Sequence, residues 1–187
     1  MEDCYQIFTQ RLELTNPWTI SRGTAAQKEY AYLKLESGGL TGWGEAAHNS
    51  RYGESLGSVR AGLELGMAWI LENPTDLAGA AGRIFADPAI PRSAKAALDM
   101  ALLDLEGKQR GLPARAVLGI VETVPPVTSF SIGIDDLDTI RAKVLAAGDY
   151  AVLKIKLGTD HDEAIMAAVR EVTDQPLRVD ANEGWKD

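Results

Sequence analysis

The chain has 187 residues, of which 45% are hydrophobic and 25% are charged, with a net charge of −8 and a single cysteine. This composition is ordinary for a globular protein, and the acidic balance argues against nucleic-acid binding because like charges repel a phosphate backbone. No apolar stretch approaches the roughly 20 residues of a membrane span. The start of the chain lacks the basic segment of a signal peptide, and Cys4 cannot form an internal disulfide. We therefore expect a cytoplasmic protein without a nucleic-acid or membrane partner.

The beginning of the chain has the short apolar spacing of strands and predicts a small antiparallel sheet. Its strands are expected over residues 5–14, 30–37 and 40–46. A loop that contains Asn16, Pro17 and Gly23 is expected after the first strand. Gly38 and Gly39 form a hairpin signal between the second and third strands.

Helices follow this sheet. They are expected over residues 54–72, 75–86 and 93–111. In the third helix, Ser93 is a candidate N-cap and Gly111 stands at the usual C-terminal position. Ala97 and Ala101 are small residues on neighbouring turns, which indicates close packing against another element. A sheet followed by helices predicts an α+β domain over residues 1–123.

From residue 124 onward the pattern changes to alternating strands and helices. Strands are expected over residues 127–134, 150–157 and 177–182, and helices over 135–148 and 160–173. Short connections in a β-α-β-α-β order predict a parallel sheet. A TIM (β/α) barrel repeats this unit eight times over about 250 residues. We therefore expect residues 124–187 to form the first three βα units of a truncated barrel.

Strand alternation places Lys154 and Lys156 on one face of the second barrel strand and Asp180 and Asn182 on one face of the third. Both pairs lie at the carboxyl ends of strands, where barrel enzymes have their active sites. The alternative is two solvated lysines and a capping Asp-Asn pair. Because the opposite face of the lysine strand is apolar and the two polar pairs recur at the same strand end, we favour the functional interpretation.

The chemistry of these residues suits proton abstraction. Two neighbouring ammonium groups disfavour each other's charge, so one lysine can lose its proton below the ordinary pKa of about 10.4 and act as a general base. The Asp180 carboxylate is a hard oxygen ligand suited to Mg²⁺, and the Asn182 amide can orient a ligand or water. A base beside a divalent ion can remove a proton α to a carboxylate and stabilise the enolate.

Several segments in fixed order resemble the muconate-lactonizing branch of the enolase superfamily, which uses a Lys or His base with Mg²⁺. They are GWGEA (42–46), AKAALDMALLDLEGKQRGLPARAVLG (94–119), TSFSIGID (128–135), LKIKLG (153–158) and RVDANEGW (178–185). The resemblance covers essentially the whole chain and is nearest to the dipeptide epimerases of the Ala-Glu type. It implies that residues 1–123 form a capping domain and that the chain is the N-terminal part of such an enzyme.

The resemblance also implies roles for individual residues. Lys156 would be the catalytic acid/base, with Lys154 tuning its pKa and contacting the substrate carboxylate. Asp180 would be the first of three acidic ligands of Mg²⁺, and Asn182 a supporting polar group at the substrate. The other ligands and an opposing lysine base would lie beyond Asp187.

Two further residues are implied substrate contacts. Ser131 matches a hydroxyl of the first barrel strand, and Arg22 lies near the position of an arginine in the first capping loop. The alternatives, a hydroxyl that fills the barrel and an exposed loop charge, weigh about equally for these two residues.

The sequence therefore predicts an isomerase: a Mg²⁺-dependent epimerase or racemase, with an L-Ala-D/L-Glu-type dipeptide as the leading substrate and an acylamino acid as the next. N-acylamino-acid racemase, o-succinylbenzoate synthase and muconate cycloisomerase are alternatives within the branch. A non-catalytic scaffold is the alternative from another class, and a homo-oligomer is left open. We expect the 187 residues alone to be inactive and unstable, with an open sheet edge at the third barrel strand.

Overall fold

The computed structural model describes residues 4–72, 77–120 and 124–186. Contacts divide the chain into two compact units. The first comprises Met1–Leu12 and Glu29–Thr123, and the second comprises Glu13–Lys28 and Val124–Asp187. The predicted domains, 1–123 and 124–187, differ from these units in the placement of residues 13–28.

The N-terminal sheet has the strand order β1-β2-β3. Its strands are β1 (Cys4–Ile20), β2 (Gly23–Ser37) and β3 (Leu40–Ala46). The prediction of a loop at Asn16 and Pro17 is wrong, because β1 continues through both to Ile20. Proline lacks a backbone N–H, but β1 lies at the edge of this sheet, where a proline can be accommodated. The predicted hairpin at Gly38 and Gly39 is confirmed: both have positive φ, 58° and 81°, and β2 pairs antiparallel with β3 around them.

Three helices complete the α+β part of the first unit. They are α1 (Leu56–Glu72), α2 (Leu77–Ala86) and α3 (Arg92–Arg110). A short 3-10 turn (Ser50–Tyr52) precedes α1, and a short helix α4 (Ala114–Val117) follows α3. The core contains Leu33 of β2, Leu63 and Met67 of α1, and Leu98 of α3, all fully or almost fully buried. The predicted α+β class of this part is confirmed.

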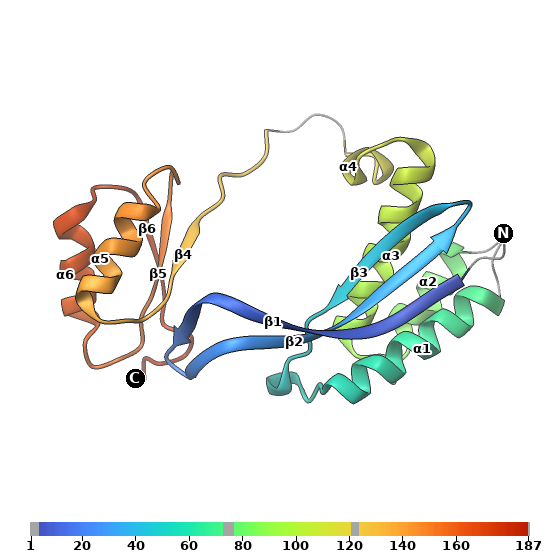
Figure 1. Cartoon of the computed structure of the whole chain (residues 1–187), viewed down its shortest axis with the longest axis horizontal. Coiled ribbons are helices and arrows are strands. Elements are labelled where there is room, and N and C mark those ends of the chain that lie inside the picture. The colour runs from blue at the N-terminus through green and yellow to red at the C-terminus, as the bar shows by residue number, and fades with distance from the viewer. Residues whose placement is uncertain (1–3, 73–76, 121–123, 187) are drawn as a thin grey trace. The chain divides into compact units, whose positions relative to one another are not determined.

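Helix α3 approaches β3 at backbone distance, and the two elements lie side by side in Figure 1. A Cβ atom at Gly44 would lie 1.9 Å from the Ala97 carbonyl oxygen, and one at Gly42 would lie 2.2 Å from that of Ala101. The close packing predicted from the two alanines is therefore present, and two glycines of β3 make it sterically feasible.

The start of α3 is capped by a residue from outside the helix, so the prediction of Ser93 as N-cap is wrong. Pro91 occupies the N-cap position and provides no side-chain bond. The Glu54 carboxylate instead accepts hydrogen bonds from the backbone N–H of Ser93 at 3.1 Å and of Asn49 at 3.1 Å. Burial alone would raise the pKa of Glu54, but these hydrogen bonds outweigh it and lower the pKa. At the other end, Gly111 has a φ of 64° and confirms the predicted C-terminal glycine.

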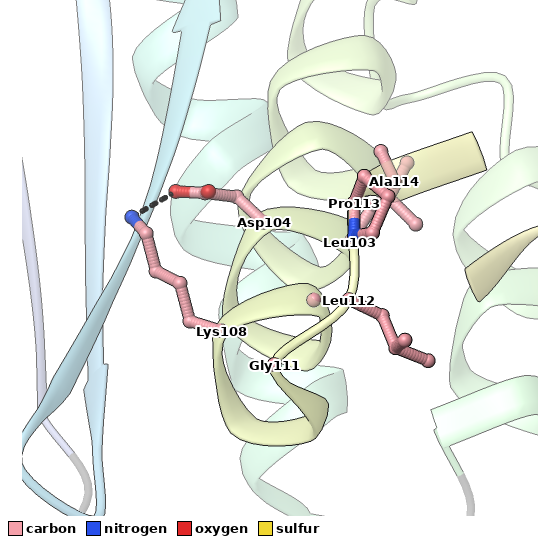
Figure 2. A pocket seen from close by; sticks show the side chains of 8 residues that line it. Leu103, Asp104, Lys108, Gly111, Leu112, Pro113 and Ala114 are labelled. Atoms are coloured by element: carbon pink, nitrogen blue, oxygen red, sulfur yellow. Dashed lines mark hydrogen bonds and ion pairs between the residues drawn. The ribbon is translucent and has the colours of Figure 1, made fainter. Parts of the chain in front are cut away.

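A pocket of about 340 Å³ lies at the C-terminal end of α3. Figure 2 shows Lys108 reaching Asp104 on one side of the helix and Leu112 on the other. The Asp104 carboxylate accepts from Lys108 at 2.6 Å and from the Trp43 backbone N–H at 2.9 Å. This carboxylate therefore serves the packing of α3 on β3, and the apolar rest of the lining carries no chemistry.

The second unit contains the predicted β-α-β-α-β pattern. Its elements are β4 (Phe130–Ile132), α5 (Leu137–Ala146), β5 (Leu153–Lys156), α6 (Asp162–Val172) and β6 (Leu177–Asp180). The strands pair in parallel in the order β4-β5-β6. Helices α5 and α6 lie on one side of the three strands (Figure 1). Leu153 and Ile155 of β5 are buried in one core with Ile140 of α5 and Ile165 of α6. The beginning of parallel βα units is thus confirmed.

No helix in the described part of the chain combines the length and the apolar character that crossing a membrane requires.

Candidate active site at the ends of β5 and β6

The parallel register brings the predicted site residues to one face of the second sheet. Ser131 is paired with Lys154, and Lys156 is paired with Asp180. In-register partners of parallel strands point to the same face, and residues two apart share that face. Lys154, Lys156 and Asp180 therefore lie on the face opposite to Leu153 and Ile155. The strand alternation predicted that these three side chains share one face, and the register of β5 and β6 places them so.

The centre of the site is an ion pair shared by two lysines. The Nζ atoms of Lys154 and Lys156 each lie 2.8 Å from Oδ2 of Asp180. Lys156 is only 8% exposed and is the single charged residue in the described core, whereas Lys154 is half-buried. Hydrogen bonds from Lys154 and Lys156 hold the pKa of the Asp180 carboxyl well below its usual range. Asp180 is therefore a carboxylate at any ordinary pH.

Asn182 completes what we call the lysine–aspartate cluster: Lys154, Lys156, Asp180 and Asn182. Its Oδ1 accepts from Lys156 Nζ at 2.9 Å, and its backbone N–H donates to Asp180 Oδ1 at 2.9 Å. Asn182 and Glu183 both have positive φ, 47° and 65°. Such conformations cost about 1–3 kcal/mol each in non-glycine residues and persist only where surrounding contacts enforce them. The turn after β6 is therefore held in place by its neighbours.

Part of that support comes from the connection between β1 and β2, which belongs to the same unit. The Ser21 hydroxyl donates to the carbonyl oxygen of Ala181 at 2.9 Å. Arg22, predicted to contact substrate, donates to the carbonyl oxygen of Asn182 at 3.0 Å and lies 3.6 Å from the Glu183 carboxylate. In this structure Arg22 thus supports the turn.

The other predicted contact, Ser131, is half-buried on β4 beside Lys154, as its register requires. Sequence reasoning missed Ser21, because a serine in a strand connection carries no local signal of a partner 160 residues later. It also missed Asp162, whose carboxylate binds the loop after β5.

The charge on this face is positive although the chain is acidic. Among the described residues of β5 and β6, Lys154, Lys156 and Arg178 share this face with one carboxylate, that of Asp180. An anionic group placed above the cluster would therefore be attracted by excess positive charge at short range, where screening is weak. A substrate that carries a carboxylate suits this surface.

Mg²⁺ binding requires more oxygen ligands than this face provides. The ion prefers six oxygen ligands, and Asp180 is a suitable one by its chemistry. Among residues 4–72, 77–120 and 124–186, however, there is no group of three or more His, Cys, Asp or Glu side chains that could hold a metal ion. The described residues therefore contribute fewer than three such side chains to a metal site, and Asp180 is the candidate on this face.

The N-terminal sequence matches the pattern of a known family. Residues 5–119 match the mandelate racemase / muconate lactonizing enzyme, N-terminal domain. The chain belongs to this family. The family match ends shortly before the parallel βα units begin, and the relatives below extend the similarity over nearly the whole chain.

Several proteins similar to this chain are dipeptide epimerases. The chain is 37% identical over 183 residues to the L-Ala-D/L-Glu epimerase of Bacteroides thetaiotaomicron, a match that covers 96% of this chain and 47% of that protein. It is 38% identical over 194 residues to the L-Ala-D/L-amino acid epimerase of Pedosphaera parvula, covering 97% of the chain and 54% of the relative. The chain therefore spans about half the length of the curated relatives it matches.

Solved structures agree with this family assignment. An enolase family member from Agrobacterium tumefaciens with bound sodium and L-Ala-L-Glu superposes with a TM-score of 0.83 at 35% identity, covering 100% of this chain and 56% of that one. The dipeptide epimerase of Enterococcus faecalis V583, complexed with Mg and L-Leu-L-Tyr, gives a TM-score of 0.84 at 31% identity, covering 97% and 53%. The predicted resemblance to the dipeptide epimerases of the enolase superfamily is confirmed.

Proposed function

We propose that the whole protein is a dipeptide epimerase of the L-Ala-D/L-Glu type, an isomerase that moves the proton on the carbon α to a carboxylate. The observation that carries the proposal is the lysine–aspartate cluster, in which an almost fully buried Lys156 and its neighbour Lys154 share one carboxylate. The dipeptide epimerases among its relatives supply the substrate class.

In this proposal Lys156 is the base on one side of the substrate. Its Nζ donates to Asp180 and to Asn182, and a neutral amine that gives its two protons to these partners keeps a lone pair at the remaining position. The remaining position is available to a substrate. The neutral amine takes the proton from the α-carbon, the electron pair of the C–H bond moves toward the carboxylate carbon, and an enolate forms. Return of a proton to the opposite face, from a second base outside the described residues, inverts the centre.

The proposal assigns the other residues of this face to binding. Lys154 and the net positive charge would attract the substrate carboxylate, and Asn182 would hold Lys156 at a fixed position. Ser131 lies in register with Lys154 and is proposed as a hydroxyl contact to the substrate. Arg22 is proposed as a substrate contact only if it leaves Asn182 when substrate binds.

We propose Mg²⁺ as the cofactor, with Asp180 as one ligand, and this is supported by the Mg-bound epimerase of Enterococcus faecalis V583. When bound, the ion would stabilise the negative charge of the enolate. The remaining ligands and the second base would have to come from outside the described residues. Consistent with that, we propose that the 187 residues alone do not turn over substrate. A cytoplasmic location stays a prediction.

The proposal is tested by deuterium exchange at the α-carbon. The protein in its natural length is incubated in D₂O with Mg²⁺ and a panel of dipeptides, among them L-Ala-L-Glu and L-Leu-L-Tyr, and NMR follows loss of the α-proton signal. We expect exchange and epimerisation of at least one dipeptide. The Lys156→Met variant should lose exchange on the Lys156 side by about 10²–10⁴-fold, the usual contribution of a positioned base.

A matched lysine separates the base from a general loss of charge. Lys95 donates to the carbonyl oxygen of Phe85 in the first unit, so Lys95→Met removes the same positive charge outside the cluster. Exchange by Lys95→Met should equal that of the wild type. Absence of exchange across the panel by folded wild-type protein would refute the epimerase and would favour the scaffold.

A second candidate is racemisation of an acylamino acid. The N-succinyl Arg/Lys racemase of Bacillus cereus ATCC 14579 superposes with a TM-score of 0.84 at 27% identity, covering 98% of this chain and 52% of that one. Both reactions remove a proton α to a carboxylate. The panel should therefore include N-succinyl amino acids, and faster exchange of these than of dipeptides would select the racemase.

A further inference from the structure

We propose that Asp162 is a positioning residue that holds together the two loops from which the lysine–aspartate cluster is built. Asp162 is the first residue of α6 and makes no contact with the lysines or with Asp180 among the described hydrogen bonds. The effect of Asp162 on catalysis rests on the proposed function. Its mechanical role can be tested without that function.

The Asp162 carboxylate accepts hydrogen bonds from the loop that comes after Lys156. Its oxygens accept from the Gly158 N–H at 2.9 and 3.0 Å, from the Thr159 N–H at 2.9 Å and from the Thr159 hydroxyl at 3.0 Å. Gly158 lies two residues after Lys156. The carboxylate therefore fixes where β5 ends.

The same carboxylate also binds the loop after β6. Its Oδ2 accepts from the indole N–H of Trp185 at 2.7 Å. Trp185 follows the turn at Asn182–Gly184, in which the Gly184 N–H donates to the Ala181 carbonyl at 2.8 Å. One side chain thus connects the segment after Lys156 to the segment after Asp180.

The two loops also touch each other directly, so a shift of one is passed to the other. A Cβ atom at Gly184 would lie 2.6 Å from the Gly158 Cα, and one at Gly158 would lie 2.4 Å from the Ala181 carbonyl oxygen. Since Asn182 contacts Lys156 across this junction, loosening either loop would displace the Lys156 amine from its partners.

The carboxylate form of Asp162 is the form that this arrangement requires. Burial alone would raise its pKa, but hydrogen bonds from Trp185, Thr159 and Gly158 outweigh burial and lower the pKa. An amide at this position cannot accept on both atoms, because its nitrogen would face backbone N–H donors. Asp162→Asn therefore keeps the size of the side chain and removes half of its accepting capacity.

The first readout is backbone amide hydrogen exchange of the natural-length protein, measured by mass spectrometry. Asp162→Asn should speed exchange by about tenfold or more in residues 157–162 and also in residues 181–186, because hydrogen bonds to a charged group are lost. Trp185→Phe should speed exchange more in residues 181–186 than in residues 157–162, because it removes only the bond from Asp162 to the second loop. Asp160→Asn removes the same charge from an exposed position in the same loop and should change neither segment. Faster exchange in residues 157–162 alone, or in neither segment, would overturn the proposal.

The second readout is the kinetics of α-proton exchange. Asp162→Asn should lower kcat by about 10²-fold, as a displacement of about 1 Å at a reacting group does, while KM stays within about twofold. Asp160→Asn should match the wild type in both constants. Wild-type kcat in Asp162→Asn would refute the catalytic part of this inference. If the wild-type protein exchanges no substrate, the proposed function fails, and the amide exchange comparison still decides the positioning role.

Discussion

Gly44 is the glycine of the first unit at which an added side chain would clash most severely. In Gly44→Ala the new Cβ would lie 1.9 Å from the carbonyl oxygen of Ala97 and 2.7 Å from its carbonyl carbon. Both are backbone atoms of α3, so no side-chain rotation can relieve the clash. The helix would have to retreat by about 1 Å from a close-packed core.

Overpacking a core costs about 1–3 kcal/mol, and a clash with backbone belongs at the upper end. With a urea m-value of about 1–3 kcal/mol/M, a loss of about 3 kcal/mol lowers the unfolding midpoint by about 1–3 M. Far-UV circular dichroism in a urea titration measures this shift. Gly82→Ala is the control: its Cβ meets nothing within 4 Å in helix α2, so it should stabilise the protein by about 0.5–1 kcal/mol.

The reasoning about the contact between α3 and β3 would be refuted by a Gly44→Ala protein within about 0.5 kcal/mol of the wild type, the range of ordinary surface substitutions. The backbone conformation of Gly44 is not in the left-handed region, so strain of φ cannot account for a loss. A destabilised variant therefore reports the lack of space alone.

Three further perturbations test other parts of the structure. Glu54→Gln should destabilise the protein by about 1 kcal/mol near neutral pH, as loss of a helix cap does. Because the pKa of Glu54 lies below its ordinary 4.5, its contribution to the free energy of unfolding is complete above pH 4.5 and is lost as the pH falls through the lowered pKa. The melting temperatures of wild type and variant should therefore converge in acid. A difference in melting temperature that widens in acid would contradict this. Leu63→Ala, at a fully buried position, should cost about 2–5 kcal/mol in a urea titration, and a cost below about 1 kcal/mol would place Leu63 outside the core. Gly158→Ala should abolish α-proton exchange, because its φ is 102° and its Cβ would lie 2.4 Å from the Ala181 carbonyl oxygen; full activity would show that the loops do not meet there.

Local pattern was enough to predict the elements whose side chains alternate or repeat regularly. Lys154 and Lys156 could be assigned to one face because the strand between Leu153 and Lys156 has the alternation of a half-apolar strand, with Leu153 and Ile155 buried on the other face. The same alternation in the next strand assigned Asp180 to that face. The parallel pairing of the strands followed from the helices between them, since such connections leave little other choice.

The errors have a common physical cause, which is that contact with another segment of the chain overrides local propensity. Pro17 marks a loop by local propensity, but pairing of the long β1 and β2 strands overrides it. Ser93 has the side chain of a good N-cap, yet Glu54 occupies the donors at that helix end. Asp162 was missed for the same reason, because its partners lie on two loops and only one of them is close to it in sequence.

The bond between Ser21 and Ala181 sets an order of events during synthesis, because 160 residues separate its two ends. A ribosome adds about 5–20 residues per second, so the serine is added about 8–32 seconds before its partner. Residues 13–28 belong by their contacts to the second unit, yet they are made before every other part of it. The bonds of residues 21 and 22 to the second unit therefore cannot form until β6 and the turn after it have been made, whereas the first unit has all of its residues sooner.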